Sequence, residues 1–364
     1  RSAHRLVRTS TRARRAQPER GTMSHTRPLR RTDHGLWLFG RELQFAPRLD
    51  ERPDHEQCSP VWIKRALQHA QALPSGGWYV VDQSRAITEV ARAYIVRGRS
   101  LVVWRDRHGI VAAPEACPHL GASLAGVCAK DGKLTCPWHG LQLGRDSGLR
   151  TLRGYDDGVL FWVQLSDERQ LNERPVIAPR PVGALQAVLR IEASCDPRDV
   201  IQNRLDPWHG RHFHPHSFGS LHVIEQDQRS ITVRVAFKVL GPLAVQVDAR
   251  FHCPDPRSIV MTIVRGEGEG SVVETHATPM RPGRTAIVEA TLATSERPGF
   301  RYTRALSWAL RPLMGWSARR LWTEDAAYAE RLYTLRAQRE DAQPEAHAAA
   351  ELVCLHASGP PHRA

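Results

Sequence analysis

Long apolar segments are missing from this chain. No uncharged apolar run reaches the roughly 18 residues that a transmembrane helix requires, and no segment has the apolar core of a secretory signal. Cysteine is also sparse, with seven scattered residues among 364. This odd number argues against a disulfide framework and for a reducing compartment. We therefore expect a cytoplasmic protein that folds around ordinary apolar cores, for which 41% hydrophobic residues are sufficient.

Acidic residues are nearly absent from residues 1–31. This segment holds ten arginines and a single acid, Glu19, and so carries about +9 of the formal net charge of +13. The rest of the chain is nearly balanced, with 41 basic and 37 acidic residues. The charge excess therefore belongs to a basic leader, and the folded body gives no reason to expect nucleic-acid binding.

Three interpretations of this leader remain open. It has no apolar periodicity, it begins with Arg1, and Met23 follows as a plausible first residue. Residues 1–22 are thus upstream sequence outside the working protein, an Arg- and Ser-rich transit peptide, or a functional basic arm. We expect residues 1–31 to be disordered or not native.

The remaining sequence divides by its texture. We predict an N-terminal extension over 32–77, a small all-β domain over 78–180, a second domain over 181–337 and a flexible tail over 338–364. The all-β domain begins at Trp78, where short runs of β-branched and aromatic residues start, and a proline-rich joint near Pro179 ends it.

The second domain combines a sheet with flanking helices. Alternating apolar and polar residues predict antiparallel strands over 231–239, 245–251, 258–264, 271–277 and 284–293. A polar, histidine-rich helix is predicted over 199–213, before the strands. A second helix, broken near Pro312, is predicted over 301–337, after them. The fold class is therefore α+β.

The strongest chemical signal is a pair of Cys/His loops, Cys117-Pro-His119 and Cys136-Pro-Trp-His139. Two thiolates and two imidazoles suit either a structural zinc ion or a Rieske [2Fe–2S] cluster, in which one iron takes two cysteines and the other two histidines. A zinc finger keeps its cysteines together and its histidines together. Here each loop offers one of each, so that the loops can clamp a cluster from both sides, and the spacing favours the cluster.

The sequences CPHLG at 117–121 and CPWHG at 136–140 resemble the two cluster-binding loops of Rieske proteins. Respiratory members of that family carry an extra cysteine in each loop, whereas this chain has Ala122 and Trp138 there. The resemblance is therefore to the Rieske domains of oxygenases and soluble ferredoxins. Cys128, between the loops, is interpreted as a small buried residue rather than a ligand.

A second group of possible metal ligands lies downstream, at Asn203, Asp206, His209, His212, His214 and His216. Two imidazoles and a remote carboxylate form the facial triad of non-heme Fe(II) oxygenases, which leaves positions open for O₂. In isolation, this pattern would be explained better by a solvated polar helix with incidental histidines. Its position after Rieske-like loops favours an iron site.

This block resembles the N-x-x-D-x-x-H-x-x-x-x-H motif of Rieske non-heme iron oxygenases. The resemblance implies that His209 and His214 are iron ligands. It also implies that Asp206 bridges to a cluster ligand of a neighbouring subunit, and that Asn203 lies near the iron without binding it. The other two histidines have no assigned role, and either could replace His214 if the local turn differs.

The third iron ligand is expected on the C-terminal helix, where members of this family often carry an acidic pair. The pair here is Glu324-Asp325. On a helix Asp325 shares a face with Leu321 and Tyr328 and would point inward, whereas Glu324 would point elsewhere. We predict Asp325 as the ligand, with Glu324 as its rival.

The resemblance covers about residues 78–337 and implies a terminal oxygenase. Its fold would be a Rieske β-domain followed by a helix-grip catalytic domain, an antiparallel sheet with a C-terminal helix. A [2Fe–2S] cluster would pass electrons to a mononuclear Fe(II), which activates O₂ for hydroxylation, demethylation or desaturation. The electrons would come ultimately from NAD(P)H through a separate reductase, often with a ferredoxin. A homotrimer is expected, because electrons in this family cross between subunits.

Surface and pocket residues indicate the partners only broadly. The inward strand faces are apolar, so we expect an apolar substrate of the steroid, terpenoid, carotenoid or aromatic kind. The segment 300–320 interleaves aromatic and aliphatic residues with arginines. It suits a lip for a lipid-like substrate, a contact with a membrane surface, or simply a helix packed on the core. Basic residues near the cluster loops could dock an acidic ferredoxin, at Arg105, Arg107, Lys130, Lys133 and Arg145.

Two alternatives to an oxygenase remain. The first is a Rieske electron-transfer or redox-sensing protein whose second domain holds no iron. The second is a binding module stapled by zinc. Iron and sulfide content would separate all three.

Overall fold

The computed structural model describes residues 29–32, 35–38, 41–45, 54–147, 149–168, 170–240 and 243–357. Most of the predicted leader, residues 1–28, lies outside the described residues, as do residues 358–364 of the predicted tail. The chain divides into two units, Arg1–Leu43 and Gln44–Ala364. The first unit contains an antiparallel meander of β1 (Leu29–Thr32), β2 (Gly35–Leu38) and most of β3 (Arg41–Phe45). Strand β1 thus starts inside the predicted leader.

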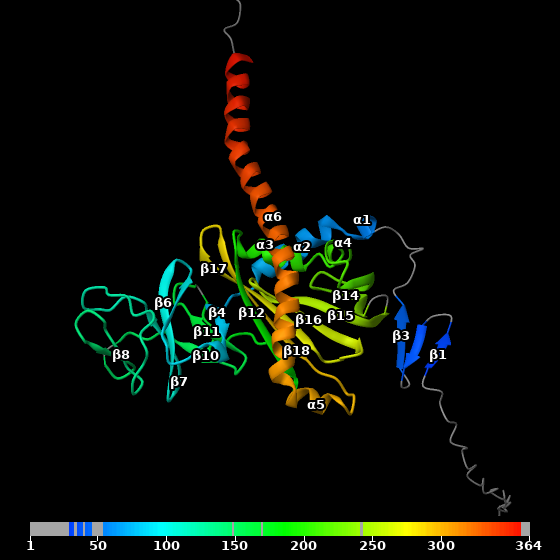
Figure 1. Cartoon of the computed structure of the whole chain (residues 1–364). Coiled ribbons are helices and arrows are strands. Elements are labelled where there is room, and N and C mark those ends of the chain that lie inside the picture. The colour runs from blue at the N-terminus through cyan, green and yellow to red at the C-terminus, as the bar shows by residue number, and fades with distance from the viewer. Residues whose placement is uncertain are drawn as a thin grey trace, which may run out of the picture. The chain divides into compact units, whose positions relative to one another are not determined.

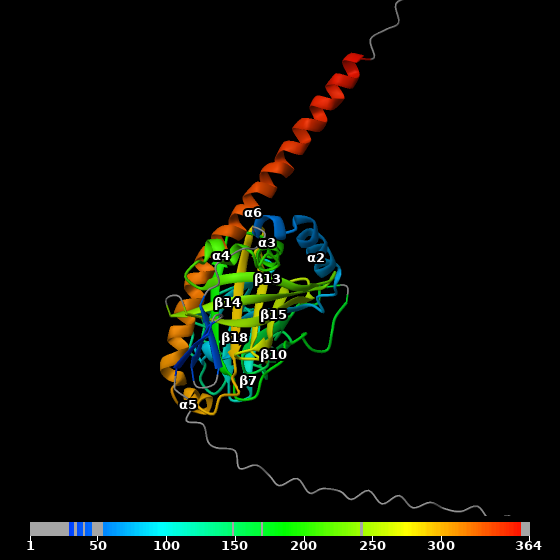
Figure 2. The same cartoon turned by 90° about the vertical axis from the view of Figure 1, so that its right-hand side faces the viewer.

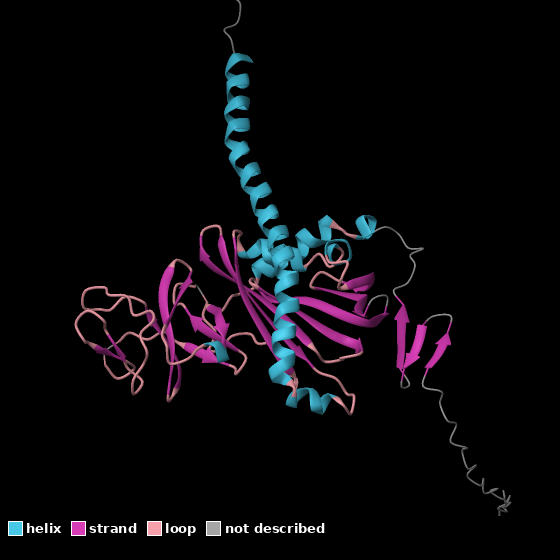
Figure 3. Cartoon of the chain, viewed as in Figure 1, coloured by secondary structure: helices cyan, strands magenta, loops and turns pink. Residues whose placement is uncertain are grey.

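The Rieske-like segment folds as a small β-domain (Figure 3). One sheet has the order β10-β11-β4, a second the order β5-β6-β7, and β8 pairs with β9. Their bounds are β4 Trp78–Gln83, β5 Arg92–Val96, β6 Arg99–Asp106, β7 Gly109–Pro114, β8 Leu134–Thr135, β9 Gln142–Leu143, β10 Gly154–Asp156 and β11 Leu160–Gln164, with a 3₁₀ turn η1 at Ser84–Ala86. The prediction of an N-terminal β region is confirmed, whereas the domain bounds 78–180 stay a prediction.

The second domain is built on an antiparallel sheet in the order β13-β14-β15-β16-β17-β18-β12. The strands are β12 Leu185–Ala193, β13 Phe218–Gln226, β14 Ser230–Leu240, β15 Leu243–Asp255, β16 Ser258–Gly266, β17 Val272–Arg281 and β18 Arg284–Ala293. The five predicted strands are all present. They form because alternate side chains are apolar and lie on a buried face. β13 and β12, which were not predicted, lie at the two ends of this row.

Helices cover one face of this sheet (Figure 1). They are α1 Asp54–Gln57, α2 Pro60–Ala72, α3 Pro197–Arg204, α4 His209–Phe213, α5 Phe300–Ala305 and α6 Ser307–Ala357. The C-terminal helix breaks at Leu306 instead of near Pro312, which lies inside α6. It also continues past the predicted boundary at residue 338, and its C-terminal part projects beyond the sheet (Figure 2).

The predicted N-terminal extension supplies part of the second domain's core. Ile63 and Leu67 of α2 lie in one buried cluster with Ile201 of α3 and Trp322 of α6. The Ser59 hydroxyl caps α2 by accepting a hydrogen bond from the Trp62 backbone N–H at 3.3 Å. Helix α2 therefore belongs structurally to the domain that follows the β-domain.

The β-domain packs directly on the sheet of the second domain. Trp78 and Trp162 lie in one buried cluster with Val260 and Val288. Arg180, in the proline-rich joint, places its guanidinium 2.5 Å from Asp157 of the β-domain and 2.6 Å from Glu274 of β17. Apolar packing and a charged clamp thus join the two domains.

None of the helices in the described part of the chain is long and apolar enough to cross a membrane. The cytoplasmic location stays a prediction.

Candidate metal centres

The two Cys/His loops have the same build. In each, a glycine four residues after the cysteine donates its backbone N–H to the cysteine carbonyl, Gly121 to Cys117 at 2.8 Å and Gly140 to Cys136 at 2.9 Å. Both glycines have positive φ, +82° and +73°, a conformation that glycine adopts without steric cost. The loops can therefore turn tightly and bring their Cys and His side chains to one place.

The four predicted cluster ligands are arranged in depth. Cys117 and Cys136 are buried, each 2% exposed, whereas His119 and His139 are exposed. The two imidazole rings lie 4.8 Å apart between centroids, at 78° to each other. This arrangement offers two sulfur ligands on the inside and two nitrogen ligands on the outside, as a Rieske cluster requires.

Backbone groups prepare one of the thiols for metal binding. The pKa of Cys136 is lowered, chiefly because the Trp138 backbone N–H donates to its sulfur. The His139 backbone N–H and the Cys117 thiol add to this effect, which outweighs burial. A thiolate is the form that ligates iron, so the loops fit a [2Fe–2S] cluster.

The surface around the exposed histidines is apolar. Leu120, Trp138 and Leu141 are 63%, 61% and 42% exposed.

Cys128 is also exposed, so its interpretation as a small buried residue was wrong. Cys128 forms an isolated antiparallel β-bridge with Val90.

Two of the predicted basic docking residues are held by acids within the chain. Arg145 pairs with Asp106 at 2.9 Å and Arg105 with Asp156 at 3.5 Å. Arg107 and Lys130 are exposed. They remain available at the surface of the β-domain.

The second metal block forms two helices instead of the single predicted one. Asp196 and Asp199 form a capping box at the start of α3. Helix α3 ends at Arg204 and α4 starts at His209, with Asp206-Pro207 between them. Proline disfavours helical backbone at the residue before it, which explains the break. Helix α4 ends at Phe213, as the expected position of His214 requires.

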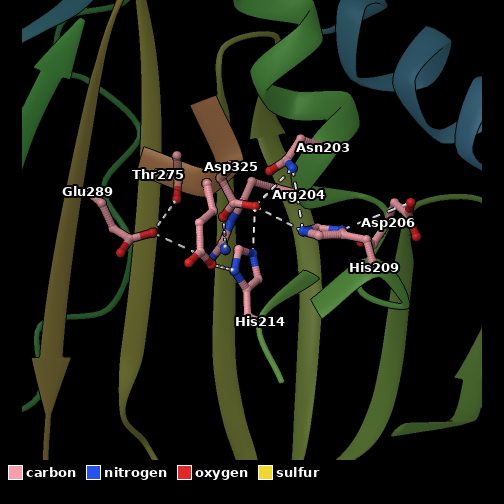
Figure 4. A network of polar contacts seen from close by, with 9 residues as sticks. Asn203, Arg204, Asp206, His209, His214, Thr275, Glu289 and Asp325 are labelled. Atoms are coloured by element: carbon pink, nitrogen blue, oxygen red, sulfur yellow. Dashed lines mark hydrogen bonds and ion pairs between the residues drawn. The ribbon is translucent and has the colours of Figure 1, made fainter. Parts of the chain in front are cut away.

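His209, His214 and Asp325 converge although they come from different elements (Figure 4). The Nε2 atom of His209 lies 2.9 Å, and that of His214 3.0 Å, from Oδ1 of Asp325. One ligand atom from each residue can be chosen so that all three lie within 4.8 Å of one another. Donor atoms about 2.0–2.2 Å from a metal, at right angles, lie about 3 Å apart. The three residues therefore fit a facial triad around one iron.

Hydrogen bonds on the far side of each imidazole orient it toward this point. His209 Nδ1 contacts the Asp206 carbonyl oxygen, and His214 Nδ1 contacts Oε2 of Glu324. A proton held on Nδ1 leaves the Nε2 lone pair for a metal. The amide of Asn203, which is fully buried, donates to Asp325 Oδ1 at 3.1 Å.

The carboxylate of the triad is held in its charged form. Burial raises the pKa of Asp325, but its close contacts with the His209 and His214 rings and the charge of Arg204 outweigh it, and the pKa is strongly lowered. Burial lowers the pKa of His214, but Asp325 and Glu324 reverse this and raise it. A negative carboxylate among imidazoles suits a divalent cation.

The two residues of the acidic pair contact different nitrogens of His214. Asp325 is 2% exposed and its Oδ1 atom faces both histidines. We expected Glu324 to point away from the site. Instead, its Oε2 atom contacts Nδ1 of His214, the ring nitrogen on the side away from Asp325. His212 is paired with Asp54 at 2.8 Å, and its side chain is 69% exposed. This pairing gives no support to His212 as a substitute ligand.

The Asp206 carboxylate lies at the edge of the triad, with Oδ2 4.0 Å from Nδ1 of His209. The same carboxylate accepts a hydrogen bond from the Tyr328 hydroxyl at 3.0 Å and lies 3.6 Å from the Cys58 sulfur. The Tyr328 ring stacks on His209, with centroids 5.1 Å apart. Tyr328 was not predicted to be a site residue. Its place one turn after Asp325 on the same helix could have indicated that it lies beside the site.

Arg204 is a further residue that sequence reasoning missed. Its guanidinium lies 3.9 Å from Asp325 and 3.5 Å from Glu289, which also accepts from Thr275 at 3.1 Å (Figure 4). It also lies over the Trp322 ring, 5.6 Å from its centroid. Its place between Asn203 and Asp206 in the sequence was the only hint.

A cavity of about 60 Å³ opens beside the triad. Most of its walls are apolar, formed by Phe218, Leu221, Val233, Val235, Phe237, Phe251 and Leu321. Its polar walls are Arg204, Asp206, His209, His214 and Asp325. The triad therefore faces a small apolar space.

Two family models match consecutive parts of the chain. The Rieske [2Fe-2S] domain matches residues 77–155, and a domain of unknown function, DUF5914, matches residues 166–340. The second match includes all three triad residues.

Curated relatives include oxygenase components. The vanillate O-demethylase oxygenase subunit of a Pseudomonas species is 29% identical over 183 residues, which cover 45% of this chain and 50% of that protein. The oxygenase component of chloroacetanilide N-alkylformylase from Rhizorhabdus wittichii is 28% identical over 167 residues, or 39% of this chain and 47% of that protein. The matched segments thus span half or less of these relatives.

Solved structures share the fold over most of the chain. Dicamba monooxygenase bound to dicamba has a TM-score of 0.56 at 17% identity, covering 80% of this chain and 92% of that one. The terminal oxygenase of carbazole 1,9a-dioxygenase from Nocardioides aromaticivorans has a TM-score of 0.52 at 13% identity, covering 79% and 93%. The chain therefore contains a Rieske [2Fe-2S] domain over residues 77–155 and shares its fold with dicamba monooxygenase and with the terminal oxygenase of carbazole 1,9a-dioxygenase.

Proposed function

We propose that this chain is the terminal oxygenase component of a Rieske system. The observation that carries the proposal is the convergence of His209, His214 and Asp325, buried beside an apolar cavity, in a chain that also has a Rieske domain. A Rieske protein that only transfers electrons would not need this second ligand set. Iron held by the triad would supply the activation of O₂.

The residues around the triad have separate tasks in this proposal. Glu324 and the Asp206 carbonyl hold the protons of the two imidazoles away from the metal. Asn203 holds Asp325 by its amide, and Arg204 lies close to the same carboxylate. The apolar walls exclude water from the space in which a substrate would lie.

Electron delivery between subunits is part of the same proposal. The cluster loops lie at one end of the β-domain, around β8, and α4 lies at the opposite end of the second domain (Figure 1). The ligands of one chain are therefore well separated, which supports a homotrimer in which the cluster of one subunit serves the iron of the next. Asp206, which precedes α4 and lies beside His209, would receive the neighbour's cluster ligand. Its carboxylate is already oriented by Tyr328.

The exposed surface of the β-domain indicates the kind of electron donor, and the cavity beside the triad indicates the kind of substrate. The apolar rim of Leu120, Trp138 and Leu141 with exposed basic residues nearby suits an acidic ferredoxin or a reductase, supplied ultimately by NAD(P)H. The cavity is smaller than the roughly 300–1,000 Å³ of pockets for drug-sized ligands. An apolar substrate, aromatic, steroid or terpenoid, would therefore move lining side chains outward as it binds. The names of the relatives, such as vanillate O-demethylase and dicamba monooxygenase, favour an aromatic one.

Metal analysis and turnover test the proposal together. The protein, isolated without oxygen, should contain about three irons and two acid-labile sulfides per chain and give a reduced Rieske EPR signal. With a ferredoxin, a reductase and NADH, it should convert one of a panel of methoxylated aromatic, steroid or terpenoid compounds in an O₂-dependent reaction. Two irons per chain without the third would overturn the proposal in favour of an electron-transfer protein. Zinc without sulfide would leave only a zinc-stapled binding module.

A further inference from the structure

The start of the C-terminal helical segment exposes an unusual number of large apolar side chains. Leu306, Trp308, Leu313 and Trp316 are 53%, 75%, 61% and 62% exposed, and Tyr302 of α5 is 60% exposed. We call these five residues the α5–α6 patch. Single exposed apolar residues are normal at protein surfaces, whereas a group of large ones marks an interaction site.

Helical geometry gathers the patch on the solvent side of α6. Positions 308, 312 and 316 are four residues apart and lie along one side of the helix. Together with positions 313, 319 and 320 they span an arc of about 140°. Asp325, which is buried, lies on the opposite side, and Arg311 and the buried Trp322 lie on the flank of the helix next to Trp308. The patch is therefore turned away from the core that α6 otherwise covers.

The sequence around the patch is rich in arginine. Residues 298–323 contain five arginines and no aspartate or glutamate. Arg319 and Arg320 are exposed on the same side of α6 as the two tryptophans. This part of the surface combines aromatic side chains with positive charge.

Arg311 adds an independent observation. Its Nε atom is buried and makes no hydrogen bond to any residue that the structure describes. Burial and the nearby charge of Arg85 lower its pKa. Two cations close together, one with an unpaired donor, favour a bound anion. A phosphate group would satisfy both.

We propose that the α5–α6 patch binds the surface of a membrane that contains anionic lipids. Tryptophan and tyrosine side chains prefer the boundary between headgroups and acyl chains, and arginines beside them contact phosphates. A second copy of the chain suits the patch less well, because pairing two such patches would bring arginines together without acids. The proposal concerns attachment and does not depend on the oxygenase activity.

Vesicle binding by the complete protein tests the proposal. The probes are vesicles of phosphatidylcholine alone and of an equimolar mixture with phosphatidylglycerol, sedimented with the protein at low and high salt. We expect binding to the mixed vesicles only, weakened by salt. Replacing Trp308 and Trp316 together by serine should lower the partition coefficient about tenfold or more. Arg311→Gln and Arg320→Gln should each lower it about fivefold.

Matched variants keep the test specific. Ile224→Ser removes an exposed apolar residue on β13, and Arg229→Gln removes an exposed arginine after it. Both should bind like the unaltered protein. Trp308, Trp316 and Arg320 are exposed and Arg311 is partly buried, so the variants should fold, which circular dichroism would verify. The proposal is overturned if the unaltered protein ignores the mixed vesicles, or if the tryptophan pair can be replaced without loss. It is also overturned if the replacement dissociates an oligomer, since the patch would then be a subunit interface.

Discussion

The two candidate metal centres of this chain are built in opposite ways. The cluster loops take all four ligands from residues 117–139, on two turns of the same construction that expose their histidines. The triad joins His209 and His214 to Asp325, which lies 116 residues after His209, and buries all but part of His209. An electron carrier needs an exposed edge, whereas a site that activates O₂ needs a dry cavity. The comparison shows that a short stretch of sequence is sufficient to bring the cluster ligands together, whereas the triad forms only when the whole second domain is folded.

Removing one ligand should separate the two centres most clearly. In His209→Ala we expect iron to fall from about three to about two per chain, with the Rieske EPR signal unchanged. Product formation should fall to background, because the triad cannot hold its metal. Iron analysis, EPR and product analysis measure these effects.

A histidine of the same block provides the control. His212→Ala changes an exposed side chain that contacts Asp54 and should keep three irons. Loss of the cluster signal in His209→Ala would show that the two centres are not independent.

Buried tryptophans should distinguish the two cores. Trp322 packs beside the triad and Trp104 beside the cluster loops, and they are 1% and 0% exposed. Trp322→Ala and Trp104→Ala should each cost about 3–5 kcal/mol of stability, through a cavity that cannot collapse. Denaturant unfolding followed by cluster absorbance and by circular dichroism tests whether each loss is local. Identical shifts of both probes in both variants would mean that the domains unfold as one.

Glu324 should affect only the triad, and less strongly. Glu324→Ala removes the partner of His214 Nδ1 and should weaken Fe(II) binding about 10–100-fold. Glu324→Gln keeps an acceptor oxygen and should restore part of this affinity. Competition with a chelator measures it, with Glu340→Gln as an exposed control on the same helix. Equal affinity in Glu324→Ala and the unaltered protein would remove Glu324 from the site.

The smallest expected effect concerns the clamp between the domains. Burial raises the pKa of Glu274, but His276 and Arg180 outweigh it, and the pKa is lowered. A carboxylate of this kind stabilises the fold above its ordinary pKa of about 4.3, and the contribution disappears as the pH falls through the lower folded value. Glu274→Gln should therefore cost about 1–3 kcal/mol at neutral pH.

The loss of stability in Glu274→Gln should depend on pH. The difference in unfolding free energy between Glu274→Gln and the unaltered protein should narrow below about pH 4. Urea unfolding at a series of pH values measures it. A difference that stays constant down to acid pH would mean that the charge of Glu274 does not contribute.

Several features followed from local sequence because their causes are local. The cluster loops needed only their Cys, His and Gly spacing, and the strands needed only alternation of apolar residues. The inward position of Asp325 followed from its place on a helix beside Leu321. Where a local rule met a competing one, prediction failed. Pro207 divided the expected helix over 199–213, whereas Pro312 did not break α6.

Other features could not be predicted because they join distant segments. Nothing near Ile63 indicates that α2 packs against Trp322, and nothing near Glu324 indicates that it meets the far nitrogen of His214. Cys128 was expected to be buried because cysteines usually are, yet it lies at the surface.

The sequence by itself determined which residue types could bind metal and in which order they occur. It also determined the periodicity that forms the sheet, since hydrogen bonding and side-chain alternation act over a few residues. Only the tertiary structure decided that most of the triad is buried, that Arg204 and Tyr328 lie beside it, and that Trp308 and Trp316 of α6 face solvent while Trp322 is buried. These outcomes depend on which surfaces pack together, and packing free energy is shared among residues far apart in the chain.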